Sequence, residues 1–400
     1  MGVILLAWLL IGLAGSGFCG LLVLLFGLMR VFARAPRLAP LAAGVAPPAT
    51  SLTVVIPAYN EAANIAACLG SVLASDPPCL DWQVLVVDDA SSDDTASLAL
   101  AAAQASGEID RFALLQAGSR PAGQRWVGKN WACTCAAEQL CSEWLLFVDA
   151  DVRLKPDTLR RALQQAIADQ ADLLSLAPRL ACACLSEWMV QPIMASLLGL
   201  GFPIEAANDP DDPTAFAAGP FMLFRRLSYE RIGGHRDLAG EVVEDLALAR
   251  RIKQAGYRLS YRLGLDAVDL QMYPNLAALW EGWTKNWFLG LEGNVAKALA
   301  ASAVVVLMFS GPWLLAPAAG MLLLLEPEHG LWWDGVLLLA GLGIAAQALL
   351  RLWSRRQFQV PMRWWWLMGL GGLLVGAIGP VSTWRSLTGQ GWTWKGRSLA

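Results

Sequence analysis

The feature that most constrains this chain is the uneven placement of its apolar residues. Residues 3–29 contain no charged side chain, and this run exceeds the about 20 residues that a transmembrane helix needs. Three more apolar blocks follow near the C-terminus, at 298–325, 331–353 and 363–383. We therefore expect an N-terminal transmembrane helix within 1–34 and a membrane region over 298–400 with two to three helices.

Charge predicts how these helices are oriented. Arg30, Arg34 and Arg37 follow the first block, residues 351–363 are basic, and the loop 326–330 is acidic. Basic flanks favour the cytoplasmic side. We expect a multi-pass protein of the plasma (inner) membrane whose segment 51–297 is cytoplasmic. The glycine-rich block 363–383, which contains Pro380, either spans the membrane or forms a re-entrant or interfacial segment.

Composition excludes some partners and predicts the state of the cysteines. The net charge is −3 and no basic run suggests a polyanion partner, so no nucleic-acid partner is expected. Eight cysteines occur without a recognised metal spacing. We expect them to be small buried hydrophobic residues in a reducing compartment.

The central segment alternates strand-like and helix-like stretches after a proline-rich linker at 35–50. The predicted strands are 52–56, 82–87, 112–115 and 144–148, and the predicted helices are 61–74, 94–105 and 130–140. This order is typical of an α/β fold with a doubly wound, mostly parallel sheet. Such sheets bind ligands beyond the carboxyl ends of their strands.

Polar residues follow three of these strands. Pro57 to Glu61 follow the first, Asp88 and Asp89 the second, and Asp149 and Asp151 the fourth. Each alone is more typical of a solvated turn or a helix cap. Gathered at one sheet edge, the carboxylates would repel each other unless a cation joined them. Magnesium usually shares carboxylate oxygens with substrate phosphates. The sequence thus predicts a metal site that holds a diphosphate.

Several motifs in this order resemble those of family 2 glycosyltransferases, which have the GT-A fold. The resemblance covers about 51–292. It rests on Thr53-Val-Val-Ile-Pro-Ala-Tyr-Asn-Glu61, Val86-Val-Asp-Asp-Ala-Ser91, Phe147-Val-Asp-Ala-Asp151, Ala218-Gly-Pro-Phe-Met-Leu-Phe-Arg-Arg226, Ile232-Gly-Gly234 and Glu244-Asp245, the last followed by Leu246, Arg251 and Gly256-Tyr257.

The resemblance implies roles for individual residues. Asp151 would hold Mg²⁺ or Mn²⁺, and Asp245 would be the general base, or only an acidic helix-start residue. One base acting opposite the leaving group would invert the anomeric centre. His235 either touches the acceptor or a phosphate, or is a satisfied polar histidine. The donor-binding residues would be Pro57, Tyr59, Glu61, Asp88, Asp89, Lys129 and Asp149, and the acceptor side would include Gly219, Glu244 and Trp287.

The acceptor is expected to be a membrane lipid. Residues 188–203 and 273–293 suit helices in the membrane interface, where tryptophan collects, or else the ordinary core of the domain. The ending Trp394-Lys-Gly-Arg397 resembles carotenoid, hopanoid and ceramide glycosyltransferases. We expect transfer of one sugar from a nucleotide sugar, with a UDP-sugar favoured, to a lipid hydroxyl.

Other functions stay open at the level of sequence. Trp283-Thr-Lys-Asn-Trp287 stands where polymer synthases of the family carry Gln-x-x-Arg-Trp, which puts a processive polysaccharide synthase in doubt. A polyprenyl-phosphate sugar transferase would use an acceptor that is already ionised. A transporter is the main rival outside enzymes, but the apolar blocks are nearly free of the charges it would need.

Overall fold

The structure is a computed structural model that describes residues 2–41, 44–390, 393–395 and 397–398. The chain forms two compact units. The sheet unit comprises Arg34–Ala181, Phe202–Met272 and Lys395–Ala400, and the helical unit comprises Met1–Ala33, Cys182–Gly201 and Tyr273–Trp394. Packing thus groups 182–201 and 273–297 with the apolar helices. The sequence analysis expected functional segments that end at residues 34, 50 and 297, and these boundaries stay predictions.

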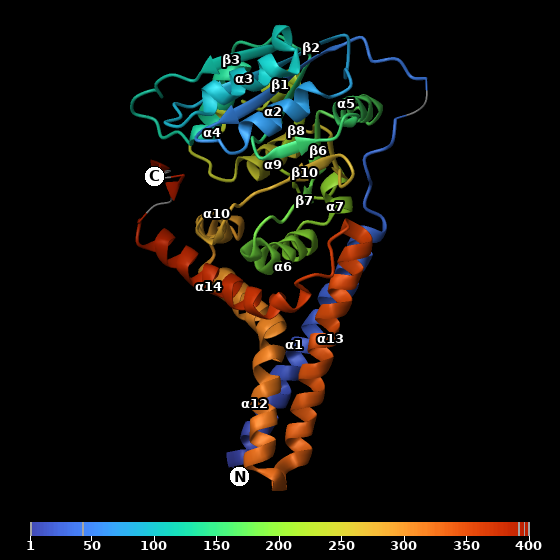
Figure 1. Ribbon diagram of the computed structural model, residues 1–400, viewed down its shortest axis with the longest axis vertical. Coiled ribbons are helices and arrows are strands. Elements are labelled where there is room, and N and C mark those ends of the chain that lie inside the picture. Colours follow the sequence, from blue (N-terminus) through green and yellow to red (C-terminus); the bar gives the residue numbers. More distant parts are fainter. Residues whose placement is uncertain (1, 42–43, 391–392, 396, 399–400) are drawn as a thin grey trace. The chain divides into compact units, whose positions relative to one another are not determined.

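A seven-stranded sheet forms the centre of the sheet unit (Figure 1). Strand β1 is parallel to β2 and β4, β2 to β3, and β6 to β9, whereas β8 is antiparallel to β4 and β6. The expected mostly parallel α/β sheet is confirmed. Its order is β3 (Phe112–Gln116), β2 (Asp81–Asp88), β1 (Ser51–Ala58), β4 (Trp144–Val148), β8 (Phe221–Arg225), β6 (Leu173–Ala177) and β9 (Leu259–Leu263).

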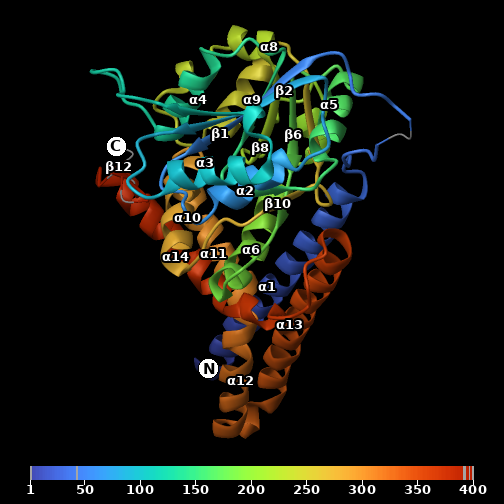
Figure 2. The ribbon, with the colours of Figure 1, turned by 45° about the horizontal axis from the view of Figure 1, so that its top comes forward.

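Helices connect the parallel strands β1, β2, β3 and β4 along the chain, except where the short turn Ile109–Arg111 also precedes β3. The helices α2 (Ile65–Leu73) and α3 (Thr95–Ser106) pack beside each other (Figure 2). Helix α4 (Gly128–Ala137) packs on β1 and β2. The chain moves outward from β1 to β3 and then returns to β4, so a right-handed path places α4 on the opposite face. Val54, Ile56 and Leu69 belong to the core between α2 and the sheet and are fully buried.

Smaller elements complete the sheet unit. A second sheet has the order β5 (Val152–Leu154), β10 (Val268–Leu270) and β7 (Arg179–Leu180). The remaining elements are α5 (Thr158–Ala168), α7 (Ile204–Asn208), α8 (Arg226–Arg231), α9 (Glu244–Gln254), the short 3₁₀ turns Ile109–Arg111 and Arg236–Leu238, and β12 (Arg397–Ser398).

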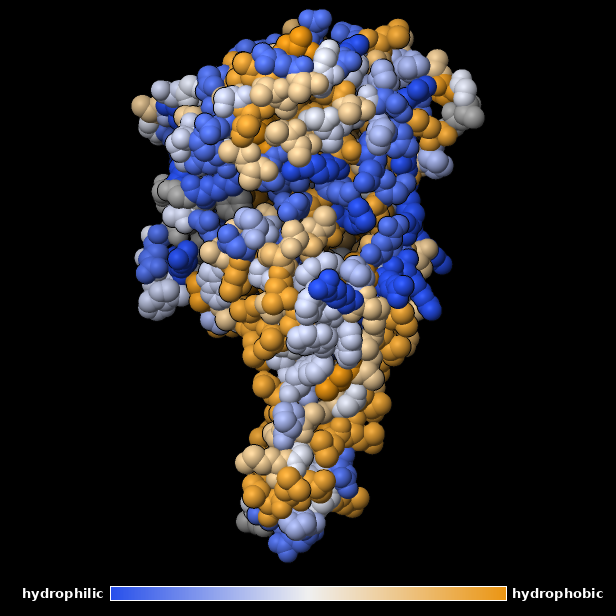
Figure 3. Space-filling model, in the orientation of Figure 1, coloured by the Kyte–Doolittle hydropathy of each residue, from blue (hydrophilic) through white to orange (hydrophobic). Residues whose placement is uncertain are grey.

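Among the described residues, the helical unit contains four stretches long and apolar enough to cross a membrane: Gly2–Ala33, Val295–Leu325, Pro327–Phe358 and Trp365–Leu387. Many apolar side chains lie on the face of this unit that Figure 3 shows. Leu324 and Leu331 are each more than four-fifths exposed. Its helices are α1 (Gly2–Ala33), α6 (Leu185–Gly201), α10 (Leu276–Gly290), α11 (Val295–Val305), the π-helical Val306–Ser310, α12 (Gly311–Leu325), α13 (Gly330–Phe358) and α14 (Met368–Leu387), with 3₁₀ turns at Pro327–His329 and Trp365–Leu367 and the short strand β11 (Thr393–Trp394).

Helix α14 differs from the other three apolar stretches. It runs obliquely to α12 and α13 within the helical unit (Figure 1). Its apolar stretch is 61% buried inside the protein, whereas the other three apolar stretches are 28–39% buried. A Cβ atom on Gly371 would collide with the carbonyl oxygen of Met189, and one on Gly372 would collide with Ser310 Oγ. Its glycines therefore permit close packing on α6 and on the π-helical turn.

Some sequence-based expectations need correction. The helix expected from residue 61 begins at Ile65. A turn precedes it, in which the Glu61 carbonyl accepts from the Asn64 and Ile65 N–H groups. All eight cysteines are free, as expected, but burial holds for only part of them. Cys19 lies on the outer surface of an apolar helix and Cys141 in the loop before β4, so both are exposed.

Candidate active site

The strand register brings the predicted strand ends to one edge of the sheet. Ala58 at the end of β1 pairs with Asp88 at the end of β2. Strand β4 is parallel to β1 and ends at Val148, so Asp149 emerges at the same edge. The Asp149 N–H donates to the carbonyl oxygen of Pro220 at 3.3 Å. The Ala218–Pro220 turn therefore lies beside the acidic residues, as the acceptor-side prediction requires.

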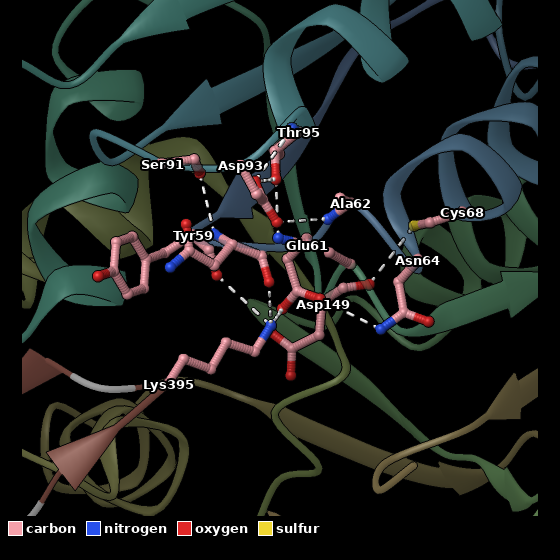
Figure 4. A network of polar contacts seen from close by, with 12 residues as sticks. Tyr59, Glu61, Ala62, Asn64, Cys68, Ser91, Asp93, Thr95, Asp149 and Lys395 are labelled. Atoms are coloured by element: carbon pink, nitrogen blue, oxygen red, sulfur yellow. Dashed lines mark hydrogen bonds and ion pairs between the residues drawn. The ribbon is translucent and has the colours of Figure 1, made fainter.

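Side chains of the segment after β2 fix the end of β1 (Figure 4). Backbone N–H groups of Asn60, Glu61 and Ala62 donate to Ser91 Oγ at 2.9 Å, Thr95 Oγ1 at 2.8 Å and Asp93 Oδ2 at 3.1 Å. Asn60 has a φ of 51°, which gives the turn a left-handed bend. We did not predict Ser91, Asp93 or Thr95 as site residues, although Ser and Asp after a strand are typical of such backbone contacts. The network orients the turn that carries Tyr59 and Glu61.

Asp151 has the properties of a metal ligand. Its Oδ1 is buried and has no hydrogen-bond partner among the described residues. Burial, and then the charges of Asp149 and Glu61, raise the pKa of Asp151 well above its usual range. An unpartnered carboxylate oxygen beside two further carboxylates fits a hard divalent cation such as Mg²⁺ or Mn²⁺.

Lys129, at the start of α4, lies between the donor and acceptor residues. Its Nζ is 2.7 Å from Asp149 Oδ1 and 2.7 Å from Glu244 Oε1. Burial opposes the ammonium charge, but the carboxylates of Asp149 and Glu244 outweigh that cost and hold the pKa of Lys129 well above its usual value. Lys129 thereby joins the two sides of the site. Its contact with a donor phosphate stays a prediction.

Asp245, at the start of α9, faces the Ala218–Pro220 turn. Its Oδ2 accepts a hydrogen bond from the Gly219 N–H at 3.1 Å, and its Oδ1 accepts one from the Leu246 N–H at 2.7 Å. A Cβ on residue 219 would lie 2.9 Å from Oδ2, so the close approach depends on glycine. Burial, and then the charge of Glu244, raise the pKa of Asp245 to about 6. A carboxylate with this pKa is ionised at neutral pH and more basic than an ordinary aspartate.

The other predicted residues take different positions. Pro57 and the buried Asp88 lie at the ends of β1 and β2. His235 is buried and shares a 2.8 Å hydrogen bond through Nδ1 with the Tyr229 hydroxyl, and burial lowers its pKa to about 3, which fits a satisfied polar histidine. Trp287 belongs to the helical unit, where its indole N–H donates to the Ala298 carbonyl at 3.2 Å. Its acceptor-side role stays a prediction.

Three cations near the donor residues were not predicted as site residues. Arg120 Nη2 lies 2.7 Å from Asp89 Oδ2, and Arg397 forms an ion pair with the same oxygen. The Lys395 Nζ lies 2.6 Å from Glu61 Oε1. For Lys395 and Arg397 the sequence signal is the ending Trp394-Lys-Gly-Arg397, which we had used only as a resemblance to lipid glycosyltransferases.

Comparison with known proteins finds a similarity to one family of enzymes. The model of glycosyl transferase family 2 matches residues 53–233. The match begins at β1, ends just after α8, and includes both acidic strand ends and the Gly219 turn. The mostly parallel sheet with helices on both faces is the GT-A arrangement expected for this family.

Curated relatives of this chain come from Staphylococcus aureus. A 4,4'-diaponeurosporenoate glycosyltransferase of strain MRSA252 is 28% identical over 255 residues, which cover 63% of this chain and 64% of that protein. The enzyme of strain USA300 is 27% identical over 263 residues, covering 65% of this chain and 66% of that protein. The chain thus spans slightly less than two thirds of the curated relatives it matches.

Solved structures show a weaker likeness. A mannosyltransferase from Pyrobaculum calidifontis, in complex with GDP-Man and Mn²⁺, is 19% identical with a TM-score of 0.49, covering 96% of this chain and 99% of that chain.

Proposed function

We propose that this protein is a membrane-bound, inverting glycosyltransferase that moves a single sugar from a nucleotide-sugar donor to a hydroxyl of a membrane lipid. The observation that carries the proposal is the continuous set of contacts from Asp149 through Lys129 to Glu244 and on to Asp245. These contacts connect the edge of the sheet that we propose to bind the metal with Asp245, the residue that we propose as the base. The similarity to diaponeurosporenoate glycosyltransferases favours an acceptor of the carotenoid kind.

On the donor side, each residue has a role that its position supports. Tyr59 and the buried Asp88 and Asp89 form the wall for the base and ribose of the nucleotide. Asp151, with Asp149 beside it, would hold Mg²⁺ or Mn²⁺ against the diphosphate. A bound divalent ion supplies Lewis-acid stabilisation of the negative charge on the departing diphosphate. Lys129 adds a fixed positive charge at the same edge.

On the acceptor side, Asp245 would remove the hydroxyl proton as the bond to the sugar forms. The Gly219 and Leu246 N–H groups hold both of its carboxylate oxygens. Its pKa of about 6 leaves it ionised near neutral pH but more basic than a solvated aspartate. A single base that faces the leaving group from the opposite side of the sugar would invert the anomeric centre.

A second kind of acceptor is favoured by one specific observation. The relatives are named for diaponeurosporenoate, a name that denotes a carboxylate. A carboxylate is already ionised at neutral pH, like the phosphate of a polyprenyl acceptor, and needs no base. With such an acceptor, Asp245 would position the Gly219 turn rather than accept a proton.

Connectivity favours three membrane crossings rather than four. The stretches Val295–Leu325 and Pro327–Phe358 would carry the chain out of the cytoplasm and back. Lys395 and Arg397 bind Glu61 and Asp89 within the sheet unit. The end of the chain therefore lies on the same side as the sheet unit, which the basic flanks place in the cytoplasm. It follows that Trp365–Leu387 does not cross, in keeping with its burial.

A donor screen tests this function. Purified protein with Mn²⁺ is offered UDP- and GDP-sugars, and release of the nucleoside diphosphate is measured with and without lipid extract. We expect one donor to be hydrolysed slowly and consumed faster with lipid. Absence of both donor binding and turnover for every nucleotide sugar would refute the proposal.

A further inference from the structure

We propose that Lys395 and Arg397, at the end of the chain, are donor-binding residues that complete the nucleotide site. Lys395 would contact the diphosphate, and Arg397 would hold the nucleoside wall. This inference rests on the proposed nucleotide-sugar donor. It assigns a role to two side chains that lie far in sequence from the residues matched by the family 2 model.

The contacts of Lys395 place its charge beside the metal-binding edge. Its Nζ lies 2.6 Å from Glu61 Oε1 and donates to the Asn60 carbonyl oxygen at 2.9 Å (Figure 4). Glu61 follows β1, which is paired with β4, and β4 ends at Val148, just before Asp149 and Asp151. The ammonium group of Lys395 therefore lies at the sheet edge where Asp151 and its metal would hold the phosphates.

Arg397 contacts the residues that we assign to the nucleoside. Its guanidinium carbon lies 3.8 Å from the centre of the Tyr59 ring, and Nη2 donates to the Asp89 carbonyl oxygen at 3.0 Å. Nη1 pairs with Asp89 Oδ2, the oxygen that Arg120 also binds. A Cβ on Gly128 would lie 2.6 Å from that oxygen, so α4 begins against this cluster. Arg397 thus fixes both the Tyr59 ring and the Asp89 turn.

Charge explains why the site needs these two cations. The donor brings a diphosphate to an edge that already holds Glu61, Asp89, Asp149 and Asp151. One divalent ion, Lys129 and the Arg120 that pairs with Asp89 offset only part of this negative charge. Two cations from the end of the chain offset much of the remainder, and charge-assisted contacts with phosphate are among the stronger polar interactions in proteins.

The test measures nucleotide binding by full-length variants in detergent. Lys395→Gln and Arg397→Gln are compared with two controls that remove similar charges elsewhere. Lys297 forms an exposed ion pair with Glu292 and matches Lys395. Arg111 pairs with Glu108 and stacks on Trp82, as Arg397 pairs with Asp89 and stacks on Tyr59. Inhibition constants are measured for UDP and GDP and for the matching nucleosides.

The two variants should give different results. Lys395→Gln should weaken nucleoside diphosphate binding about tenfold or more, the magnitude of one lost hydrogen bond to a charged group, and leave nucleoside binding nearly unchanged. Arg397→Gln should weaken both ligands. Lys395→Arg should restore most of the diphosphate affinity, and Lys297→Gln and Arg111→Gln should match the wild type. Melting temperatures without ligand identify any variant that is merely misfolded.

Three outcomes would overturn the inference. If the wild type binds neither diphosphate, the proposed donor class fails and the inference fails with it. If the wild type binds one of them and Lys395→Gln and Arg397→Gln bind equally well, only the role of the two cations is wrong. Tighter binding by the variants would show that the end of the chain blocks the donor site.

Discussion

Replacement of Asp245 by asparagine should weaken catalysis and strengthen the fold at the same time. The side chain is half-buried beside the buried Glu244, and its pKa is raised from 3.8 to about 6. The wild type must keep this carboxylate ionised in an unfavourable environment at neutral pH. Asparagine has the same shape and carries no charge. Its oxygen can still accept the hydrogen bond from Gly219, but its amide nitrogen cannot accept the one from Leu246, so the gain in stability is smaller than the charge alone would give.

The size of the stability effect follows from the pKa. A rise from 3.8 to about 6, at about 1.36 kcal/mol for each unit, amounts to at most about 3 kcal/mol. The group is protonated in both folded and unfolded protein below pH 4, and ionised in both above pH 6. Its cost is therefore absent below pH 4, grows between the two pKa values, and is complete above pH 6. Asp245→Asn should melt at a higher temperature than the wild type at pH 8, and the difference should shrink as the pH falls towards 4.

The catalytic effect has a separate signature. Loss of a general base typically costs about 100- to 10,000-fold, so transfer to a hydroxyl should fall by at least the lower factor, with donor KM nearly unchanged. The wild-type pH profile of kcat/KM should fall below about pH 6, the pKa of Asp245, and this acid limb should be absent from the variant. Asp211→Asn, at an exposed carboxylate, serves as the control. Near-normal turnover with an unchanged acid limb would refute the assignment of the base. If Asp245→Asn keeps its turnover and is also more stable than the wild type, an acceptor that is already ionised is favoured.

Three further predictions test the metal, the glycine turn and the topology. Asp151→Asn should nearly abolish transfer, and excess EDTA should do the same reversibly, so full activity in EDTA would rule out metal dependence. Gly219→Ala places a Cβ 2.9 Å from Asp245 Oδ2, which should displace the Asp245 carboxylate and lower kcat about tenfold or more. An unchanged kcat would mean that the close contact between Gly219 and Asp245 is not needed for catalysis. With the two exposed native cysteines replaced, an impermeant thiol reagent applied to intact cells should label a cysteine introduced at Glu328 but not one at Ser106 or Thr388; labelling at Thr388 would show that α14 crosses the membrane.

The fold could be predicted because local pattern and global architecture agree in this chain. Runs such as 52–56 and 144–148 are apolar and bounded by polar turns, and they became parallel strands with buried faces. The polar residues after them could be placed on one edge, since parallel strands end together. Sequence thus identified the acidic edge and the Gly219–Asp245 side from strand order and motif alone.

Other features depend on contacts between distant segments, which no local pattern reveals. Lys129 was expected to meet a phosphate but lies between two carboxylates from different elements. Lys395 and Arg397 reach residues more than 300 positions earlier in the chain. The glycine-rich block 363–383 left a spanning helix and a re-entrant or interfacial segment open, and most of it forms a helix whose neighbours pack close to its backbone. Spacing along the chain carries none of this information.

The most direct test of the central claim is transfer of labelled sugar from a nucleotide donor to a carotenoid acceptor by the purified protein. Parallel reactions would offer a hydroxylated carotenoid and a carotenoid carboxylate, and the product's anomeric configuration would be read by NMR. The account predicts one sugar per acceptor, inverted configuration, and a requirement for divalent metal, Asp151 and Asp245 with the hydroxylated acceptor. Polymeric product, retained configuration, or labelled lipid formed equally well by Asp151→Asn would contradict it.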